Sequence, residues 1–329
     1  MGQTLSEPIT TKETFLALTD NYIVGSSCMQ GWRVSMEDAH SVILSIPEDR
    51  SAAYFGVFDG HGGSSISNYA SRHLHKYIVS SPAYNQGDVK KAIEEAFNEL
   101  DSFMQNDQQL RSELAGSTAV VVLLRDDKLY CANAGDSRAV AYANNEVVPL
   151  SFDHKPTNPT ERSRITSAGA YVEFNRINGN LALSRALGDF SYKQNSSKSW
   201  KEQAVTSFPD VLERAVDDDW EFIVLACDGI WDVLSSEEVC IFVHERIITG
   251  MKPDAICEEL MECCLAPDGQ MGGIGSDNMT VIIVIFLKGV SLNYKGSLGE
   301  NLVDNVVYYL PKDKPDTSNE ENQKVEKSD

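Results

Sequence analysis

Apolar residues along the chain form short runs with the length and composition of β-strands. Six such runs, rich in Val, Ile, Phe and Tyr, cover residues 53–58, 119–124, 128–134, 138–143, 222–227 and 280–286. The runs at 120–124 and 281–287 are continuous rather than alternating. This pattern predicts strands that are buried on both faces.

Helical periodicity lies between these runs. Apolar residues from Val89 to Met104 recur at intervals of three and four, which predicts a long amphipathic helix. Further helices are expected from residue 64 to about 80, from 235 to 248 and from 253 to 264, where Pro253 suits a first helical turn. Neither a repeat nor an interior linker divides the chain, so we expect one large α/β domain.

Two parts of the chain lack this regularity. Residues 153–193 combine Pro, Thr, Asn, Gly and Arg without a strong period, so an irregular lobe or flap over the surface is expected. From about residue 312 onward, Lys, Asp, Glu, Pro, Ser and Asn dominate. That composition predicts a disordered tail.

The charge balance is strongly acidic. The 329 residues include 28 Lys and Arg against 49 Asp and Glu, which gives a formal net charge of −21. Nucleic acid is therefore excluded as a partner, because its phosphates attract clustered Lys and Arg. The acidic excess favours either ordinary solubility or carboxylates gathered around metal ions, and composition alone leaves both interpretations open.

Cysteine usage predicts a reducing compartment, since the seven cysteines include no Cys-x-x-Cys pair and several lie in apolar runs. No signal-peptide pattern and no membrane-spanning apolar run is present, so we expect a cytoplasmic protein, with the nucleus left open. We also expect a monomer. Met1-Gly2-Gln3-Thr4-Leu5-Ser6 fits the acceptor pattern for N-myristoylation at Gly2, with a chance match as the alternative. A single acyl chain would give weak, reversible membrane contact.

Four aspartates stand where apolar strands end or begin. Asp59 and Asp228 each end an apolar run in an Asp-Gly pair, Asp277 precedes the run at 280–286, and Asp136 lies between two strands. Carboxylates at the ends of core strands can converge on one edge of a sheet, where a cation offsets their repulsion. Oxygen ligands without a His cluster select Mg²⁺ or Mn²⁺. Four independent turn aspartates are the alternative.

The segment at 30–40 and His61 add groups suited to phosphate chemistry. If the segment is extended, Arg33, Ser35 and Glu37 point to one face, with Arg33 and Glu37 offset by roughly 13 Å. A metal at Glu37 and a phosphate on the Arg33 fork would then fill the gap, and a salt-bridged surface strand is the alternative. His61, close to Asp59, is suited to donate a proton to a leaving group.

Eight motifs, in order from about residue 22 to 287, carry a family resemblance. They are Trp32-Arg33-x-x-Met36-Glu37-Asp38, Val57-Phe58-Asp59-Gly60-His61-Gly62-Gly63, Ala115-Gly116-Ser117-Thr118-Ala119, Asn133-Ala134-Gly135-Asp136-Ser137-Arg138, Asp153-His154-Lys155-Pro156, Asn178-Gly179-x-Leu181-Ala182-x-Ser184-Arg185-Ala186-x-Gly188-Asp189, Ala226-Cys227-Asp228-Gly229-Ile230-Trp231-Asp232 and Ser276-Asp277-Asn278-Met279-Thr280. Together they resemble the metal-dependent protein phosphatases of the protein phosphatase 2C family. The resemblance implies a layered α/β (α+β) fold, with a central β-sandwich of two mostly antiparallel sheets flanked by helices and a binuclear metal site at one end.

The resemblance also implies a role for each matching residue. Two Mg²⁺ or Mn²⁺ ions per chain would be held by Glu37, Asp59, the backbone carbonyl of Gly60, Asp228 and Asp277. Asp38 falls on a supporting acid, and Asp136, with Asp228, falls on a weaker third metal site. Arg33 matches the phosphate-binding arginine and His61 the general acid.

The implied activity is that of a protein serine/threonine phosphatase, in which a metal-bridging water or hydroxide attacks phosphorus in line. Its partners would be phosphorylated proteins, protein kinases among them, and it would act as a negative regulator of kinase signalling. The expected organisation is an N-terminal segment 1–21, a catalytic domain 22–288 with a flap at about 157–201, and a C-terminal extension 289–329. A non-catalytic phosphoprotein adaptor and a two-metal hydrolase of small phosphate esters or nucleotides are the alternatives.

Overall fold

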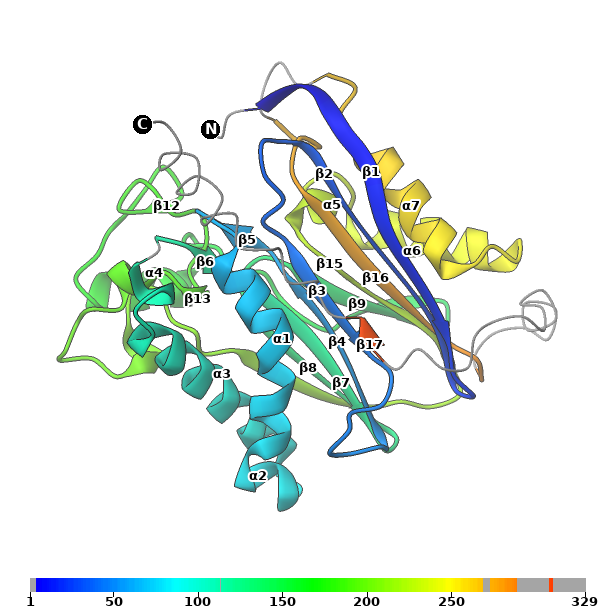
Figure 1. The fold of residues 1–329 in the computed structure, drawn as a ribbon, viewed down its shortest axis with the longest axis horizontal. Helices are drawn as coiled ribbons and strands as arrows, with labels where there is room; N and C mark the ends of the chain where they lie inside the picture. Colours follow the sequence, from blue (N-terminus) through cyan, green and yellow to red (C-terminus); the bar gives the residue numbers. More distant parts are fainter. Residues whose placement is uncertain (1–3, 113, 269–272, 289–307, 310–329) are drawn as a thin grey trace, which may run out of the picture.

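Two antiparallel sheets stacked face to face form the centre of the molecule, and helices cover both outer faces (Figure 1). The computed structural model describes residues 4–112, 114–268, 273–288 and 308–309. The myristoylation site at Gly2 and the acidic tail from about residue 312 lie outside the described residues. In the part of the chain that is described, no helix is both long and apolar enough to cross a membrane.

Six strands form the first sheet, in the order β1-β2-β16-β15-β9-β10. Their bounds are β1 Thr4–Leu18, β2 Tyr22–Arg33, β16 Met279–Phe286, β15 Trp220–Ala226, β9 Arg138–Ala143 and β10 Glu146–Pro149. Helices α6 (Ser236–Ile248) and α7 (Pro253–Cys264) cover its outer face (Figure 1). A capping box between Ser235 and Glu238 begins α6, and Pro253 occupies the first turn of α7.

The second sheet has the order β14-β8-β7-β4-β3-β17. Its strands are β14 Asp210–Ala215, β8 Lys128–Ala134, β7 Ala119–Arg125, β4 Ala52–Phe58, β3 Ala39–Ile43 and β17 Tyr308–Tyr309. Helices α1 (Ser65–Ser80), α2 (Pro82–Asn85) and α3 (Val89–Asn106) lie on its outer side (Figure 1).

The continuous apolar runs are explained by this layering. Along β16, Val281, Ile283 and Ile285 pack under α6 and α7, whereas Ile282 and Val284 fill the space between the sheets. Alternate residues of β7 divide in the same way between the core under α1 and α3 and the core between the sheets. Because side chains alternate along a strand, a strand inside a sandwich with covered outer faces needs apolar residues at every position. The prediction of strands buried on both faces is confirmed.

The flap predicted as irregular has a small core of its own. Helix α4 (Pro159–Ser167) precedes a hairpin of β11 (Val172–Glu173) and β12 (Arg176–Ile177). Five buried apolar residues hold this part together, namely Ile165, Ile177, Leu183, Ala186 and Val205. Most of this part is irregular, as expected, but the short helix, the hairpin and the small core were not predicted, because these few apolar residues lie too far apart in sequence to form a period.

The condition that the segment at residues 30–40 is extended does not hold throughout its length. Strand β2 ends at Arg33, and the chain bends through residues 34–38 before β3 begins at Ala39. The side chain of Asn278 holds this bend, because its Nδ2 donates to the carbonyls of Gln30 and Ser35 while its Oδ1 accepts from the Glu37 amide. Hydrogen bonds from one side chain thus hold residues 30–37 in place where no neighbouring strand of the described chain pairs with residues 34–38.

Candidate metal centre

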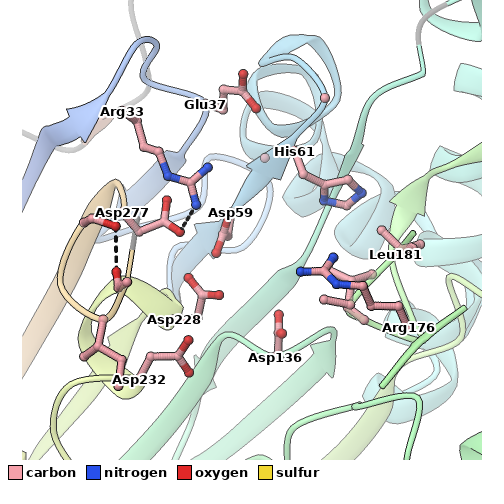
Figure 2. A pocket seen from close by; sticks show the side chains of 18 of the residues that line it. Arg33, Glu37, Asp59, His61, Asp136, Arg176, Leu181, Asp228, Asp232 and Asp277 are labelled. Carbon is pink, nitrogen blue, oxygen red and sulfur yellow. Dashed lines mark hydrogen bonds and ion pairs between the residues drawn. The ribbon is translucent and has the colours of Figure 1, made fainter. Parts of the chain in front are cut away.

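Acidic side chains line a pocket of about 700 Å³ at one end of the sandwich (Figure 2). Its described lining includes six carboxylates, those of Glu37, Asp59, Asp136, Asp228, Asp232 and Asp277. Three permanently charged basic side chains belong to the same described lining, those of Arg33, Lys155 and Arg176. The pocket is therefore net negative, and a phosphate group entering it would be repelled unless further positive charge were present.

Strand ends bring these acids together from distant parts of the sequence. Asp59 follows β4, Asp136 lies between β8 and β9, and Asp228 follows β15 by two residues. Asp277 comes two residues before β16, which pairs antiparallel with β15. An antiparallel pair places the end of one strand beside the start of the next, so Asp228 and Asp277 face the same pocket. The expected convergence of the four aspartates is confirmed.

The acids at the base of the pocket are buried close together. Ligand atoms of Asp38, Asp59 and Cys227 all lie within 4.8 Å of one another, and Thr280 Oγ1 donates to Asp38 Oδ2 at 2.7 Å. Burial raises the pKa of Asp38, Asp59 and Asp228, and the charge of Asp228 raises that of Asp59 further. Hard oxygen donors that repel one another in a buried position match the requirements of a divalent cation such as Mg²⁺ or Mn²⁺.

Glu37 and Gly60 meet at the wall of the pocket. Glu37 accepts hydrogen bonds from Ser35 Oγ at 2.8 Å and from the Gly63 amide at 3.2 Å. A Cβ atom on Gly60 would lie 2.2 Å from the Glu37 carbonyl oxygen, so only glycine fits at this position. The backbone of Gly60 can therefore approach the acids that surround it.

Two of the pocket cations are paired with acids. Arg33 forms an ion pair with Asp277 (Figure 2), a contact that the sequence did not indicate. Lys155 Nζ donates to Asp136 Oδ2 at 2.5 Å. Burial lowers the pKa of Lys155, but the charge and hydrogen bond of Asp136, together with the charges of Asp232 and Asp228, outweigh burial and leave the pKa raised. Arg33 and Lys155 thus each contact an acid of the pocket directly.

His61 is paired with a carboxylate that sequence reasoning did not single out. Its Nε2 lies 2.7 Å from Oδ2 of the buried Asp189. Burial lowers the pKa of His61, but the charge and hydrogen bond of Asp189 outweigh it, so the pKa is raised. A carboxylate can only accept, so Nε2 carries a proton and the contact leaves Nδ1 for other partners.

The structure gathers eight of the residues predicted from the sequence into the lining of this pocket. They are Arg33, Glu37, Asp59, Gly60, His61, Asp136, Asp228 and Asp277, while Asp38 lies beneath them against Asp59. Four further charged residues were not predicted as site residues, namely Lys155, Arg176 and Asp232 of the lining and Asp189, which contacts His61. Lys155, Asp189 and Asp232 belong to recognised motifs, which could have indicated them, whereas Arg176 lies in none.

Comparisons with known proteins agree with this geometry. The family model of protein phosphatase 2C matches residues 22–270. The chain is 56% identical over 291 residues to a probable protein phosphatase 2C of Caenorhabditis elegans, covering 88% of this chain and 82% of the relative. It is 46% identical to protein phosphatase 2C homolog 2 of Schizosaccharomyces pombe, over 89% of this chain and 80% of that relative.

A solved serine-threonine phosphatase 2C from Toxoplasma gondii shares the fold. The TM-score is 0.70 at 23% identity, over 84% of this chain and 99% of that one. The family model spans well over half of the chain, and the two relatives exceed 40% identity over most of their length. This chain belongs to the protein phosphatase 2C family.

Proposed function

We propose that this protein is a metal-dependent protein serine/threonine phosphatase that hydrolyses phosphoserine and phosphothreonine. The observation that carries the proposal is the convergence of acids from five separate segments on one pocket that also contains Arg33 and His61. Removing phosphate from proteins would counteract protein kinases, so the enzyme would be a negative regulator of kinase signalling. The catalytic domain would extend over residues 22–288, and β1 (Thr4–Leu18), which precedes it in the N-terminal segment, adds an edge strand to its first sheet.

The acids of the pocket would hold the metal ions. Glu37, Asp59, the carbonyl of Gly60, Asp228 and Asp277 are the proposed ligands of two Mg²⁺ or Mn²⁺ ions, with Asp38 in support and Asp136 available, with Asp228, for a weaker third ion. When bound, such ions supply the positive charge that attracts phosphate and lowers the pKa of an attacking water. The chemistry of the oxygen donors supports this assignment.

Arg33 and His61 would act on the phosphate ester itself. The guanidinium of Arg33 has five N–H donors, and its pair with Asp277 leaves a fork that can bind two phosphoryl oxygens. Asp189 engages His61 at Nε2, so a proton delivered to the departing serine or threonine oxygen would come from Nδ1.

A cysteine nucleophile is not suited to this pocket. Cys227 is fully buried, and its sulfur accepts the Thr280 amide hydrogen bond at 3.2 Å. Burial raises the pKa of Cys227 well above its ordinary value, which keeps it a thiol rather than the nucleophilic thiolate. Attack by water is therefore the mechanism that fits these side chains.

Phosphate release from a phosphothreonine peptide tests the proposal. We expect turnover with Mn²⁺, and a loss of at least about a hundredfold with EDTA or with Asp228→Asn. Asp20→Asn, which changes an exposed aspartate in the β1–β2 turn, is the matched control and should behave as the parent. Activity that persists in EDTA or in Asp228→Asn would refute the metal centre. Turnover of small phosphate esters without turnover of peptides would favour the alternative hydrolase.

A further inference from the structure

A three-stranded sheet beside the pocket holds the His61–Asp189 pair. Its order is β13 (Leu187–Gly188), β6 (Gly116–Ser117) and β5 (Gly60–His61), so Gly116 lies between His61 and Gly188. A Cβ atom on Gly116 would lie 2.5 Å from His61 Nε2 and 2.3 Å from Asp189 Oδ2. Because Gly116 has no side chain, His61 and Asp189 can contact each other above it.

The backbone that presents Asp189 is conformationally unfavourable. Gly188 has φ +75° and Asp189 has φ +49°, in the left-handed region that residues other than glycine rarely adopt. The Asp189 amide donates to the Ala115 carbonyl at 3.0 Å. A turn of this kind persists only where surrounding contacts fix it.

Asp101, on the buried face of α3, supplies such contacts. Its Oδ1 accepts the Gly188 amide at 2.8 Å and its Oδ2 accepts Lys193 Nζ at 2.6 Å. Lys193 Nζ also donates to the Ala186 carbonyl at 2.8 Å. Both members of this ion pair are nearly buried. The contacts therefore fix the backbone on both sides of Leu187, immediately before Asp189.

A buried ion pair is weak evidence of net stabilisation, since desolvation offsets most of the attraction between the charges. The Asp101–Lys193 pair is better explained by what it orders, because its hydrogen bonds to Gly188 and Ala186 lead directly to the Asp189 turn. Asp101 is not among the residues that line the pocket, so substrate does not touch it.

We propose that Asp101 is a positioning residue for His61. By pinning Gly188, Asp101 and Lys193 hold the Asp189 carboxylate against His61 Nε2, and this contact orients the imidazole for proton transfer to the leaving oxygen. The inference rests on the proposed function of His61 as the general acid. It extends the catalytic machinery from the pocket to helix α3.

Two substrates with different leaving groups test this role. Threonine leaves as a strongly basic oxygen that needs a proton, whereas p-nitrophenolate leaves without one. We expect Asp101→Ala to lower kcat on a phosphothreonine peptide by about ten- to a hundredfold with KM within about twofold, and to change kcat on p-nitrophenyl phosphate by less than about threefold. In a His61→Gln background, Asp101→Ala should lower peptide turnover by no more than about twofold, since the oriented group is already absent.

The control is Asp49→Ala, which removes a partly buried aspartate that pairs with Arg125 and accepts a hydrogen bond from Tyr84 at the other end of the second sheet. This variant should leave the ratio of the two activities unchanged. Asp101→Asn keeps an oxygen for the Gly188 amide and should lower the peptide-to-ester ratio less than Asp101→Ala. If Asp101→Ala does not fold, a fall of at least about threefold in that ratio for Asp101→Asn supports the role, and an unchanged ratio overturns it.

An equal loss on both substrates, or a further loss on top of His61→Gln, would show that Asp101 only stabilises the fold and would overturn the proposal. Absence of peptide turnover in the parent enzyme with Mn²⁺ would instead refute the proposed function. The two failures are therefore distinguished by the same set of assays.

Discussion

A buried glutamate at the start of α4 gives a quantitative test of how the flap is held. Glu161 is 2% exposed and accepts hydrogen bonds from Arg164 Nη1 at 2.6 Å, Arg185 Nη2 at 2.8 Å and Ser184 Oγ at 2.6 Å. These partners lie on α4 and on the segment that follows the β11–β12 hairpin. One carboxylate thus joins the two sides of the flap.

The stabilisation follows from the pKa of Glu161. Burial acts to raise the pKa, but the hydrogen bonds and charges of Arg185 and Arg164 outweigh it and lower the value from 4.5 to about 2. A depressed carboxylate pKa stabilises the folded state above the unfolded pKa, and this stabilisation is lost as pH falls toward the folded value. At 1.36 kcal/mol per pKa unit, the ionised group contributes about 3 kcal/mol above pH 6 and about 2 kcal/mol at pH 3.5.

Glu161→Gln removes the charge and keeps the shape. We expect the free energy of unfolding, measured with urea in EDTA at pH 7, to fall by about 3 kcal/mol, and the difference from the parent to narrow to about 2 kcal/mol at pH 3.5. Glu237→Gln, at an exposed first-turn position of α6, controls for the loss of a charge at a helix start. A difference below about 1 kcal/mol at pH 7, or one that does not change with pH, would refute the reasoning.

Three other substitutions separate catalysis from stability. Asp59→Asn should raise the free energy of unfolding in EDTA by about 1–2 kcal/mol, because it removes a buried charge that other acids repel, and a loss of stability in EDTA would contradict this. It should also abolish the rise in melting temperature that we expect Mn²⁺ to give the parent. Gly116→Ala should displace His61 from Asp189 and lower peptide turnover more than p-nitrophenyl phosphate turnover, and equal effects would contradict it. Ile283→Ala should lower the free energy of unfolding by about 3–4 kcal/mol in a urea titration with kcat unchanged at 20 °C or so, and a loss below about 1 kcal/mol would refute its place in the core.

The centre of the fold could be predicted from the sequence where its strands are apolar at nearly every position, as in β7 and β16. The run at 280–286 corresponds to β16, and the helix predicted at 253–264 is α7 with the same bounds. The strands β2 and β3 were not predicted, since Gly25, the serines of β2 and His40 interrupt the apolar pattern. These two segments are strands because they pair with β16 and β4, and such long-range pairing is not visible in the local sequence.

The candidate site was predictable residue by residue but not contact by contact. Motifs indicated Asp59 and Asp228, and the strand ends place both in the pocket. The pair of His61 with Asp189 and that of Asp136 with Lys155 could not be predicted, because they join separate segments through very short strands and loops that leave no local pattern. Periodicity describes regular elements and carries no information about such turns.

The buried sandwich offsets the energetic cost of gathering acids in one pocket. Burying like charges at strand ends is unfavourable, and the raised pKa values of Asp59 and Asp228 reflect that unfavourable energy in the folded protein. Each fully buried isoleucine or valine of β16 contributes about 1.5–3 kcal/mol in the opposite direction. The acids therefore lie next to strands whose buried side chains offset this energy. An acid far from the core could move away from its neighbours, whereas an acid within two residues of a buried strand stays where a cation can bind it.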